Sequence, residues 1–125
     1  MELYDTDNNR QISKTYSVTT SWTRVEITYP ADTTGASNAD STSGLSIKFW
    51  LHAGTDRTSG TLNSSAWGAG LNTANRVSSS STNFFDSTNR TFFITGVQFE
   101  VGDTATPFEH LTFGEELALC ERYFQ

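Results

Sequence analysis

Several short stretches of the chain alternate apolar and polar residues, and this period of two restricts the fold more than any other feature. In the clearest stretch, WTRVEITY, Val25, Ile27 and Tyr29 share one side and polar residues share the other. The same alternation recurs in residues 12–18, 45–52 and 91–102. From the last of these we expect core positions at Ile94, Val97, Phe99 and Val101. A period of two is typical of strands that bury one face, so the pattern predicts an all-β protein.

The C-terminal end of the chain has a different pattern. Thr112 and Glu115 have the spacing of a capping box, and Leu117 and Cys120 recur at helical spacing after it. We therefore predict one short α-helix over residues 112–124. A chain of 125 residues has the usual size of one domain, so we expect a single antiparallel β-sandwich that includes this helix.

Charge and hydropathy exclude two classes of partner. The chain has a formal net charge of −6 and only eight Lys and Arg residues, which are spread thinly. Nucleic-acid binding depends on clustered positive charge, so DNA and RNA are not expected partners. No apolar run reaches the roughly 20 residues that cross a bilayer, and the first residues lack the apolar segment of a signal peptide. We therefore expect neither membrane insertion nor secretion.

The residues that carry catalysis in other proteins are scattered in this chain. His52 and His110 are the only histidines, and neither lies in a motif with a nucleophile or with paired carboxylates. The chain is therefore not predicted to be an enzyme. Cys120 is the only cysteine, which excludes an intrachain disulfide, and its place on the expected helix predicts a buried structural thiol.

One acidic segment is similar to the beginning of an ion-binding loop. Residues 5–9, DTDNN, offer side-chain oxygens at the spacing of the first EF-hand positions, but the later Gly and the distant Glu are missing. We interpret the segment as a β-turn and expect no cofactor. A structural calcium ion remains the open alternative. One Cys and two scattered His make a zinc site still less expected.

The last third of the chain carries a longer signature. It comprises Gly96-Val97-Gln98, Glu100-Val101-Gly102, Ala105-Thr106-Pro107-Phe108-Glu109 and Glu116-Leu117-Ala118-Leu119-Cys120, leading into Arg122-Tyr123-Phe124. This run, residues 94–124, resembles a segment that recurs in structural proteins of tailed bacteriophages. The strand with Trp22, the LSIKFWLHAG stretch and the loop with Trp67 also resemble the carbohydrate-binding-module-like jelly roll of that family. The resemblance therefore covers nearly the whole chain.

The resemblance implies a fold, a location and partners. It implies a jelly-roll β-sandwich in a virion structural protein that is made in the host cytoplasm, as part of a tail fibre or a capsid appendage. It also implies assembly with other virion proteins and with further copies of the chain, with a homotrimer favoured. Family members usually have strands upstream of the position that matches Met1, so we expect such strands to be truncated or supplied by another chain.

One group of side chains fits sugar binding. An aromatic ring covers the C–H face of a sugar while planar polar side chains bind its hydroxyls. The alternation places Ser46, Lys48, Trp50 and His52 outward and Leu45, Ile47, Phe49 and Leu51 inward, and Trp67 follows in a Gly-rich loop. The predicted glycan-binding residues are Trp50, His52, Asp56, Arg57, Asn63 and Trp67. The alternative, that Trp67 covers the edge of the sandwich and Trp50 packs under a loop or at a subunit contact, stays open.

A second aromatic group holds too many rings for one side of a small sandwich to bury. We predict that these residues, Phe84, Phe85, Phe92 and Tyr123, contact a neighbouring subunit, because aromatic residues are enriched at interfaces. The sequence thus favours a virion module that attaches to a host surface glycan or to other virion proteins. The alternative is the glycan-binding module of a larger carbohydrate-active enzyme.

Overall fold

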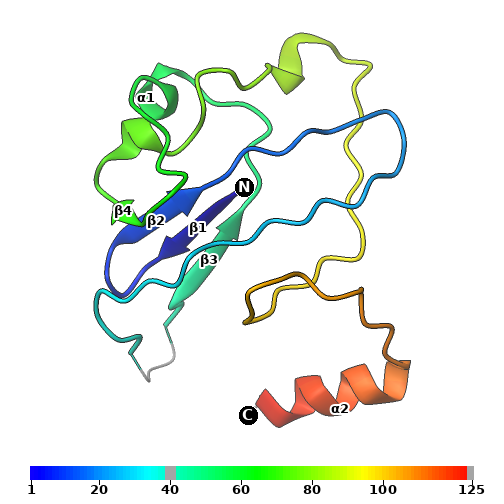
Figure 1. Cartoon of the computed structure of the whole chain (residues 1–125). Coiled ribbons are helices and arrows are strands. Elements are labelled where there is room, and N and C mark those ends of the chain that lie inside the picture. The colour runs from blue at the N-terminus through cyan, green and yellow to red at the C-terminus, as the bar shows by residue number, and fades with distance from the viewer. Residues whose placement is uncertain (39–41, 124–125) are drawn as a thin grey trace. The chain divides into compact units, whose positions relative to one another are not determined.

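The computed structural model describes residues 1–38 and 42–123, and for residues 122 and 123 it describes the backbone alone (Figure 1). Contacts within the chain divide it into two units, Met1–Thr91 (unit 1) and Phe92–Gln125 (unit 2). In the described part of the chain, unit 1 holds the strands and unit 2 holds the longest helix.

The strands of unit 1 form one open antiparallel sheet. They are β1 (Glu2–Asp5), β2 (Arg10–Ser13), β3 (Leu45–Lys48) and β4 (Gly68–Ala69), in the order β3-β1-β2-β4 (Figure 1). The described residues contain no second sheet. The predicted jelly-roll β-sandwich is therefore wrong.

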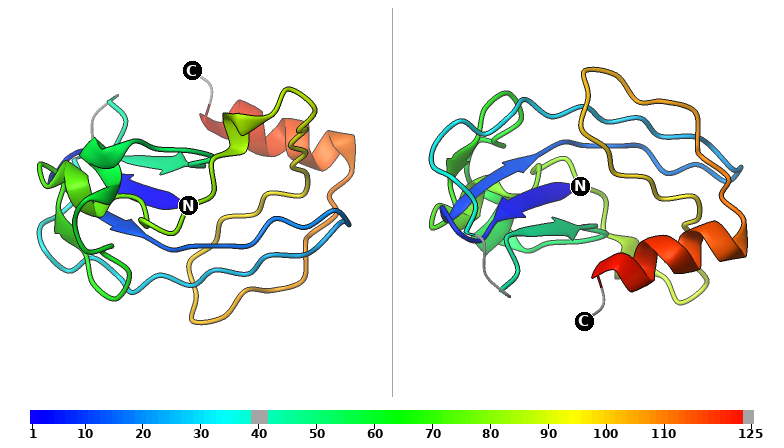
Figure 2. Two further views of the ribbon diagram at one scale, coloured as in Figure 1. Left: turned by 90° about the horizontal axis from the view of Figure 1, so that it is seen from above. Right: turned by 90° about the horizontal axis from the view of Figure 1, so that it is seen from below.

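The alternating stretches differ in whether they pair. Those at 12–18 and 45–52 contribute parts of β2 and β3, whereas 22–29 and 91–102 lie outside any strand. Both views of Figure 2 show the chain after β2 leaving the sheet in an extended path and returning to it. Alternation is a local property of one segment, but a strand also needs a second backbone about 4.8 Å away. The pattern carries no information on whether that partner is present.

A tight polar turn joins β1 to β2 and sets their register. The Asp5 carboxylate accepts hydrogen bonds from the backbone N–H of Asn8 (3.0 Å) and from its side-chain amide (2.9 Å). Asn9 has a φ of 50°, in the left-handed region that Asn tolerates. The interpretation of this segment as a β-turn is confirmed. Burial disfavours the ionised Asp5, but hydrogen bonds from Asn8 and Asp7, with the nearby Arg10 charge, outweigh burial and lower its pKa.

The two faces of the sheet bury different chemistry. One face carries Leu3 and Ile12, which are 3% and 0% exposed, with the buried Asp5 at its end. The opposite face carries Glu2, Gln11 and Ser13, which are also buried. Directly opposed residues of an antiparallel pair share a face, so Leu3 lies beside Ile12 and Glu2 lies beside Ser13. A layer of polar side chains is therefore enclosed on the face that binary patterning assigns to solvent.

Over residues 45–50 the more exposed side is the one predicted to be buried, whereas Leu51 and His52 follow the prediction. Leu45, Ile47 and Phe49 were expected to point inward, but they are 43%, 36% and 39% exposed. Lys48 and Trp50 were expected to point outward, and both are half-buried. The first half of the predicted strand forms, as β3, and residues 49–52 lie outside it. The apolar side of β3 is the more open one.

The chain that follows β3 explains this reversal, because it covers the polar face. It contains α1 (Thr55–Thr58), η1 (Thr73–Asn75) and, further along, η2 (Phe84–Asp86). The Ser13 N–H donates to the Asn63 carbonyl (2.8 Å), and the N–H of the buried Val77 donates to the Arg57 carbonyl (3.0 Å). These bonds hold the covering segment against β2 and close it on itself.

Unit 2 ends in the helix that the sequence predicts. Helix α2 spans Phe113–Tyr123. The Thr112 N–H donates to Glu115 Oε2 (2.8 Å), and the Glu115 N–H donates to Thr112 Oγ1 (3.4 Å), which completes a capping box. The helix and its cap are confirmed, and residue 124, the last of the predicted range, lies outside the described residues. Cys120 is exposed, so the prediction of a buried thiol is wrong.

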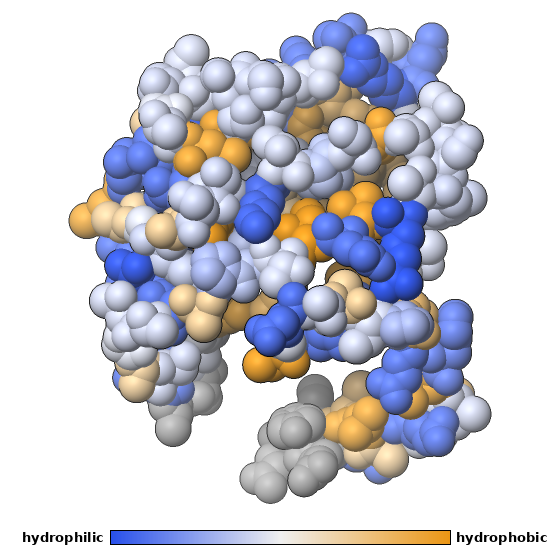
Figure 3. All heavy atoms as spheres, in the orientation of Figure 1, coloured by the Kyte–Doolittle hydropathy of each residue, from blue (hydrophilic) through white to orange (hydrophobic). Residues whose placement is uncertain are grey.

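The segment before α2 is extended and open. The residues expected in the core here, Ile94, Val97, Phe99 and Val101, are 50%, 58%, 54% and 104% exposed, so that prediction is wrong. Hydrophobic residues, drawn in orange, reach the surface in several places on the face of the molecule that Figure 3 shows. Gly96 bends the segment with a φ of 58°, and a Cβ there would lie 3.6 Å from the Phe108 ring, which packs over it.

Candidate functional site

An open depression with a volume of about 190 Å³, called the cavity below, lies on the surface of unit 1, where the segment after Pro30 meets the loop that leads into β4. Its lining combines an aromatic ring, an ion pair and several hydroxyl groups. The lining residues are Arg10, Pro30, Ala31, Asp32, Thr33, Thr34, Ser65, Ala66 and Trp67.

An ion pair between Arg10 and Asp32 joins two sides of this cavity. Arg10 is the first residue of β2, and its Nε lies 2.7 Å from Asp32 Oδ2. The two side chains are 23% and 12% exposed, so their attraction is screened less than that of a surface pair. Asp32 Oδ1 accepts a hydrogen bond from the Thr34 N–H (3.1 Å). Both carboxylate oxygens are thus held in place.

Trp67 is fixed at the cavity by one hydrogen bond of its side chain and one of its backbone. Its indole N–H donates to the Pro30 carbonyl (2.7 Å), and its own carbonyl accepts from Arg10 Nη2 (3.0 Å). The next residue, Gly68, begins β4 and pairs with Gln11 of β2. The half-buried ring is therefore tied to the sheet through its backbone and to the opposite segment through its side chain.

This combination of groups suits a polar ligand with one apolar face. The indole supplies an aromatic surface, and Arg10 and Asp32 supply a donor and an acceptor side by side. Sugars present this mixture of C–H faces and hydroxyl groups. Among the described residues, this lining holds one carboxylate and neither His nor Cys, so it brings together no pair of groups for acid–base or nucleophilic chemistry.

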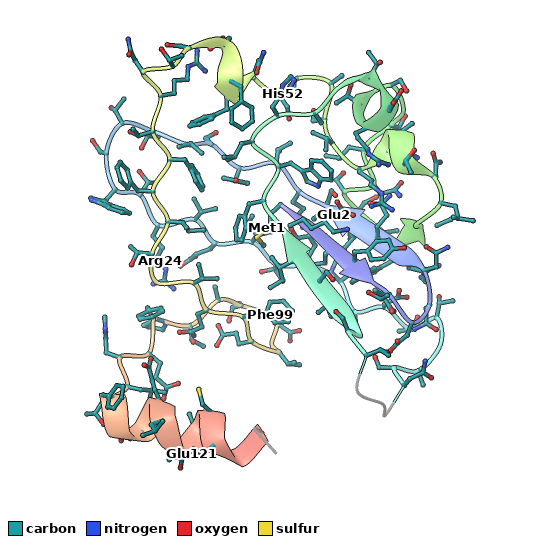
Figure 4. All side chains as sticks on the ribbon, turned by 180° about the vertical axis from the view of Figure 1, so that it is seen from behind. Met1, Glu2, Arg24, His52, Phe99 and Glu121 are labelled. Atoms are coloured by element: carbon teal, nitrogen blue, oxygen red, sulfur yellow. The ribbon has the colours of Figure 1, made fainter. Side chains whose placement is uncertain are left out.

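Trp50, the other predicted aromatic platform, belongs instead to a buried ion cluster. Its indole N–H donates to Oε2 of Glu2 (2.6 Å), which is 0% exposed and lies on β1 (Figure 4). Glu2 Oε1 lies 3.2 Å from Arg76 Nη1 and 3.6 Å from Lys48 Nζ, at ion-pair distance but without hydrogen-bond geometry. The Tyr4 ring has both cations within 5 Å of its centroid, Lys48 at 4.3 Å and Arg76 at 4.8 Å. A carboxylate this deeply buried requires such partners.

The remaining predicted glycan-binding residues lie apart from the cavity lining. His52 is exposed on the loop after β3, and its ring meets Phe85 edge-on at 6.4 Å (Figure 4). Asp56 and Arg57 lie on the single turn of α1. Asn63 connects the covering segment to β2 through its backbone. Of the predicted set, the structure brings only Trp67 to the cavity among the described residues.

Arg10 and Asp32 are the site residues that the sequence did not reveal. They lie 22 positions apart, and neither belongs to a recognisable motif. The one sequence signal near them is Pro30, which ends an alternating stretch and begins a loop rich in turn formers. Long loops often carry binding residues, but this rule does not say which residues they are.

The predicted subunit-contact residues fall in both units. Phe84 and Phe85 lie in η2 with their ring centroids 5.5 Å apart, and Phe85 is 70% exposed. Phe92 begins unit 2 and is half-buried. Tyr123 is the last residue of α2, and its side chain lies outside the described part of the molecule. Their role at an interface stays a prediction.

Within residues 1–38 and 42–123, the structure holds no group of three or more His, Cys, Asp or Glu side chains arranged to bind a metal. In the predicted ion loop, both oxygens of Asp5 accept hydrogen bonds from Asn8. None of the described helices has the length and apolar character needed to cross a membrane.

Compared with models of known protein families, with curated proteins and with solved structures, the chain matches none. The resemblance of residues 94–124 to a bacteriophage segment therefore stays a prediction.

Proposed function

We propose that this chain is a module of a bacteriophage virion protein, in a tail fibre or capsid appendage, and that it attaches to a host surface glycan through the cavity beside Trp67. The observation that carries the binding part is the lining itself. One indole ring and the Arg10–Asp32 pair face the same small space, and both are held there by hydrogen bonds to the backbone.

The virion part of the proposal rests on the signature of residues 94–124, and the local structure of that signature is consistent with a structural role. Glu100 accepts from the Thr106 N–H (2.6 Å) and from its hydroxyl (2.7 Å). The Gln98 amide donates to Glu100 (3.1 Å) and accepts from the Glu109 N–H (2.9 Å). The side chains of residues 98 and 100 thus bind residues 106 and 109 of the same segment. Such bonds suit a structural role.

Binding is tested by presenting the protein to a glycan array and to host cells. We expect Trp67→Ala to abolish binding, because it removes the aromatic wall and the indole bond to Pro30. Trp22→Ala is the matched control, since Trp22 is 73% exposed and lies outside the cavity lining. Equal binding by the Trp67 variant and the unaltered protein would remove the proposed site.

The proposal also includes self-association, with a homotrimer favoured. Phe85 is 70% exposed, and large exposed aromatic side chains are typical of interface residues. Light scattering over a range of concentrations measures the mass directly. A mass of one chain at every concentration contradicts this part of the proposal and leaves the glycan site untouched.

The other candidate, a glycan-binding module attached to a carbohydrate-active enzyme, uses the same cavity. The genes next to the coding sequence discriminate between the two hypotheses. Capsid or tail genes support the virion module, whereas a catalytic domain encoded in the same polypeptide supports the enzyme-linked module.

A further inference from the structure

The charge balance of the cavity beside Trp67 restricts which glycan it accepts. The Arg10 guanidinium already donates to the Asp32 carboxylate (2.7 Å) and to the Trp67 carbonyl (3.0 Å). Its positive charge is therefore neutralised within the protein. Arg10 is the one cation among the described residues of the lining, so a ligand carboxylate would approach Asp32, in a chain of net charge −6, without an unpaired cation to receive it.

The same two side chains retain hydrogen-bonding capacity toward a neutral ligand. Arg has five N–H donors, and two of them have the partners named above. Each Asp32 oxygen has one described hydrogen bond, to Arg10 or to Thr34, and each can accept a second. A donor and an acceptor this close match two adjacent hydroxyl groups, of which one donates to Asp32 and the other accepts from Arg10.

The volume of the cavity limits the length of the ligand. At about 190 Å³ it is smaller than the roughly 300–1,000 Å³ of pockets that hold drug-sized molecules. A space of this volume, open to solvent, fits one sugar ring against Trp67, and the rest of a glycan would extend outward. Among the described residues the lining holds one aromatic ring, so it offers no row of rings to an extended oligosaccharide.

We infer that the cavity binds a single neutral sugar residue at the end of a glycan, through a vicinal diol held between Asp32 and Arg10 and a C–H face held against Trp67. This inference rests on the proposed function and adds the class of sugar to it. Asp32 and Arg10 become the residues that determine specificity.

The test uses the full chain and methyl glycosides of hexoses, measured by NMR chemical-shift titration. We expect neutral methyl hexosides to bind, and the corresponding uronic acids and N-acetylneuraminic acid to bind about tenfold or more weakly. Monodeoxy hexosides that lack either hydroxyl of the recognised pair should also lose about tenfold or more, the usual loss for a hydrogen bond to a charged group. This arm needs no substitution and is independent of folding.

A variant arm assigns the effect to Asp32. Asp32→Asn should weaken the neutral hexoside about tenfold or more, with the amide spectrum of β1 unchanged and that of β2 changed only near Arg10, whose ion pair it removes. Asp86→Asn is the matched control, because Asp86 also pairs with an arginine, Arg90 (2.8 Å), but lies outside the cavity. It should leave binding unchanged.

The outcomes separate this inference from the proposed function. Uronic acids that bind as well as neutral hexosides, in a manner that Trp67→Ala abolishes, overturn the neutral-diol inference and leave glycan binding standing. Undiminished binding of every monodeoxy hexoside does the same. No binding by the unaltered protein to any sugar of the panel or array overturns both.

Discussion

The two units of the chain place their polar side chains in opposite ways. Unit 1 buries Glu2, Gln11 and Ser13 on one face of its sheet and balances the charge with residues from distant parts of the sequence. In unit 2, by contrast, none of the described side chains is buried, and the polar bonds join near neighbours such as Thr112 and Glu115. The difference shows that unit 1 depends on long-range contacts and unit 2 on local ones.

The substitution expected to lower the free energy of unfolding most removes the buried carboxylate charge of unit 1. Glu2→Gln leaves Arg76, whose side chain is 12% exposed, without its counter-charge. Removing one partner of a buried ion pair typically costs about 3–5 kcal/mol, so we expect a loss of that order in the free energy of unfolding, measured in urea. Glu26→Gln is the control: its pair with Arg24 is more than half exposed on both sides and should contribute less than about 1 kcal/mol. Equal losses in the two variants would contradict the cluster's role.

A second substitution in unit 1 tests a buried polar group that lacks hydrogen-bond partners among the described residues. Both amide atoms of Gln11 are without a hydrogen-bond partner in the described part of the molecule, although the residue is 0% exposed. An unsatisfied buried polar group typically costs about 1–3 kcal/mol, so Gln11→Met, which nearly keeps the volume, should raise the free energy of unfolding by an amount within that range. Ser64→Ala, at an exposed position, should change little. A destabilised Gln11→Met protein would show that the amide is satisfied in solution.

In unit 2 the expected effect is smaller and confined to one helix. Thr112→Ala removes the hydroxyl that receives the Glu115 N–H, and the loss of such a cap costs about 0.5–2 kcal/mol of helix stability. Amide hydrogen exchange of α2 should therefore become faster while that of β1 and β2 is unchanged. Thr104→Ala, outside the helix, serves as the control. Faster exchange in β1 as well would show that the units are coupled.

The smallest expected effect is a difference in acid sensitivity. The pKa of Asp5 is lowered in the folded state, so its contribution to stability is present above its ordinary value of about 4 and is lost as the pH falls through the lowered value. Asp5→Asn lacks this titration. We expect the free energy of unfolding of this variant to fall less than that of the unaltered protein as the pH is lowered from 5 through the titration of Asp5. Urea titrations of both proteins at each pH measure the difference. Parallel pH profiles for the two proteins would contradict the role of the Asp5 turn.

Features that depend on near neighbours were predictable from the sequence alone. The helix, its capping box at Thr112 and Glu115, and the turn at Asp5 are set by hydrogen bonds that span three residues. Parts of β2 and β3 were also found, because alternation makes a segment able to pair. None of these required knowledge of what lies across from the segment.

Tertiary structure alone decided which strands pair, which face is covered and where a cavity forms. The sheet stops at β3 and β4, β3 turns its apolar side to the more open face, and Arg10, Asp32 and Trp67 meet from positions 22 and 35 residues apart. Such contacts form only after long loops close, and periodicity does not specify which distant segment supplies the partner. Trp67 was recognised as an aromatic anchor by its residue type, whereas its ionic partners became visible only once the folded chain had brought them together.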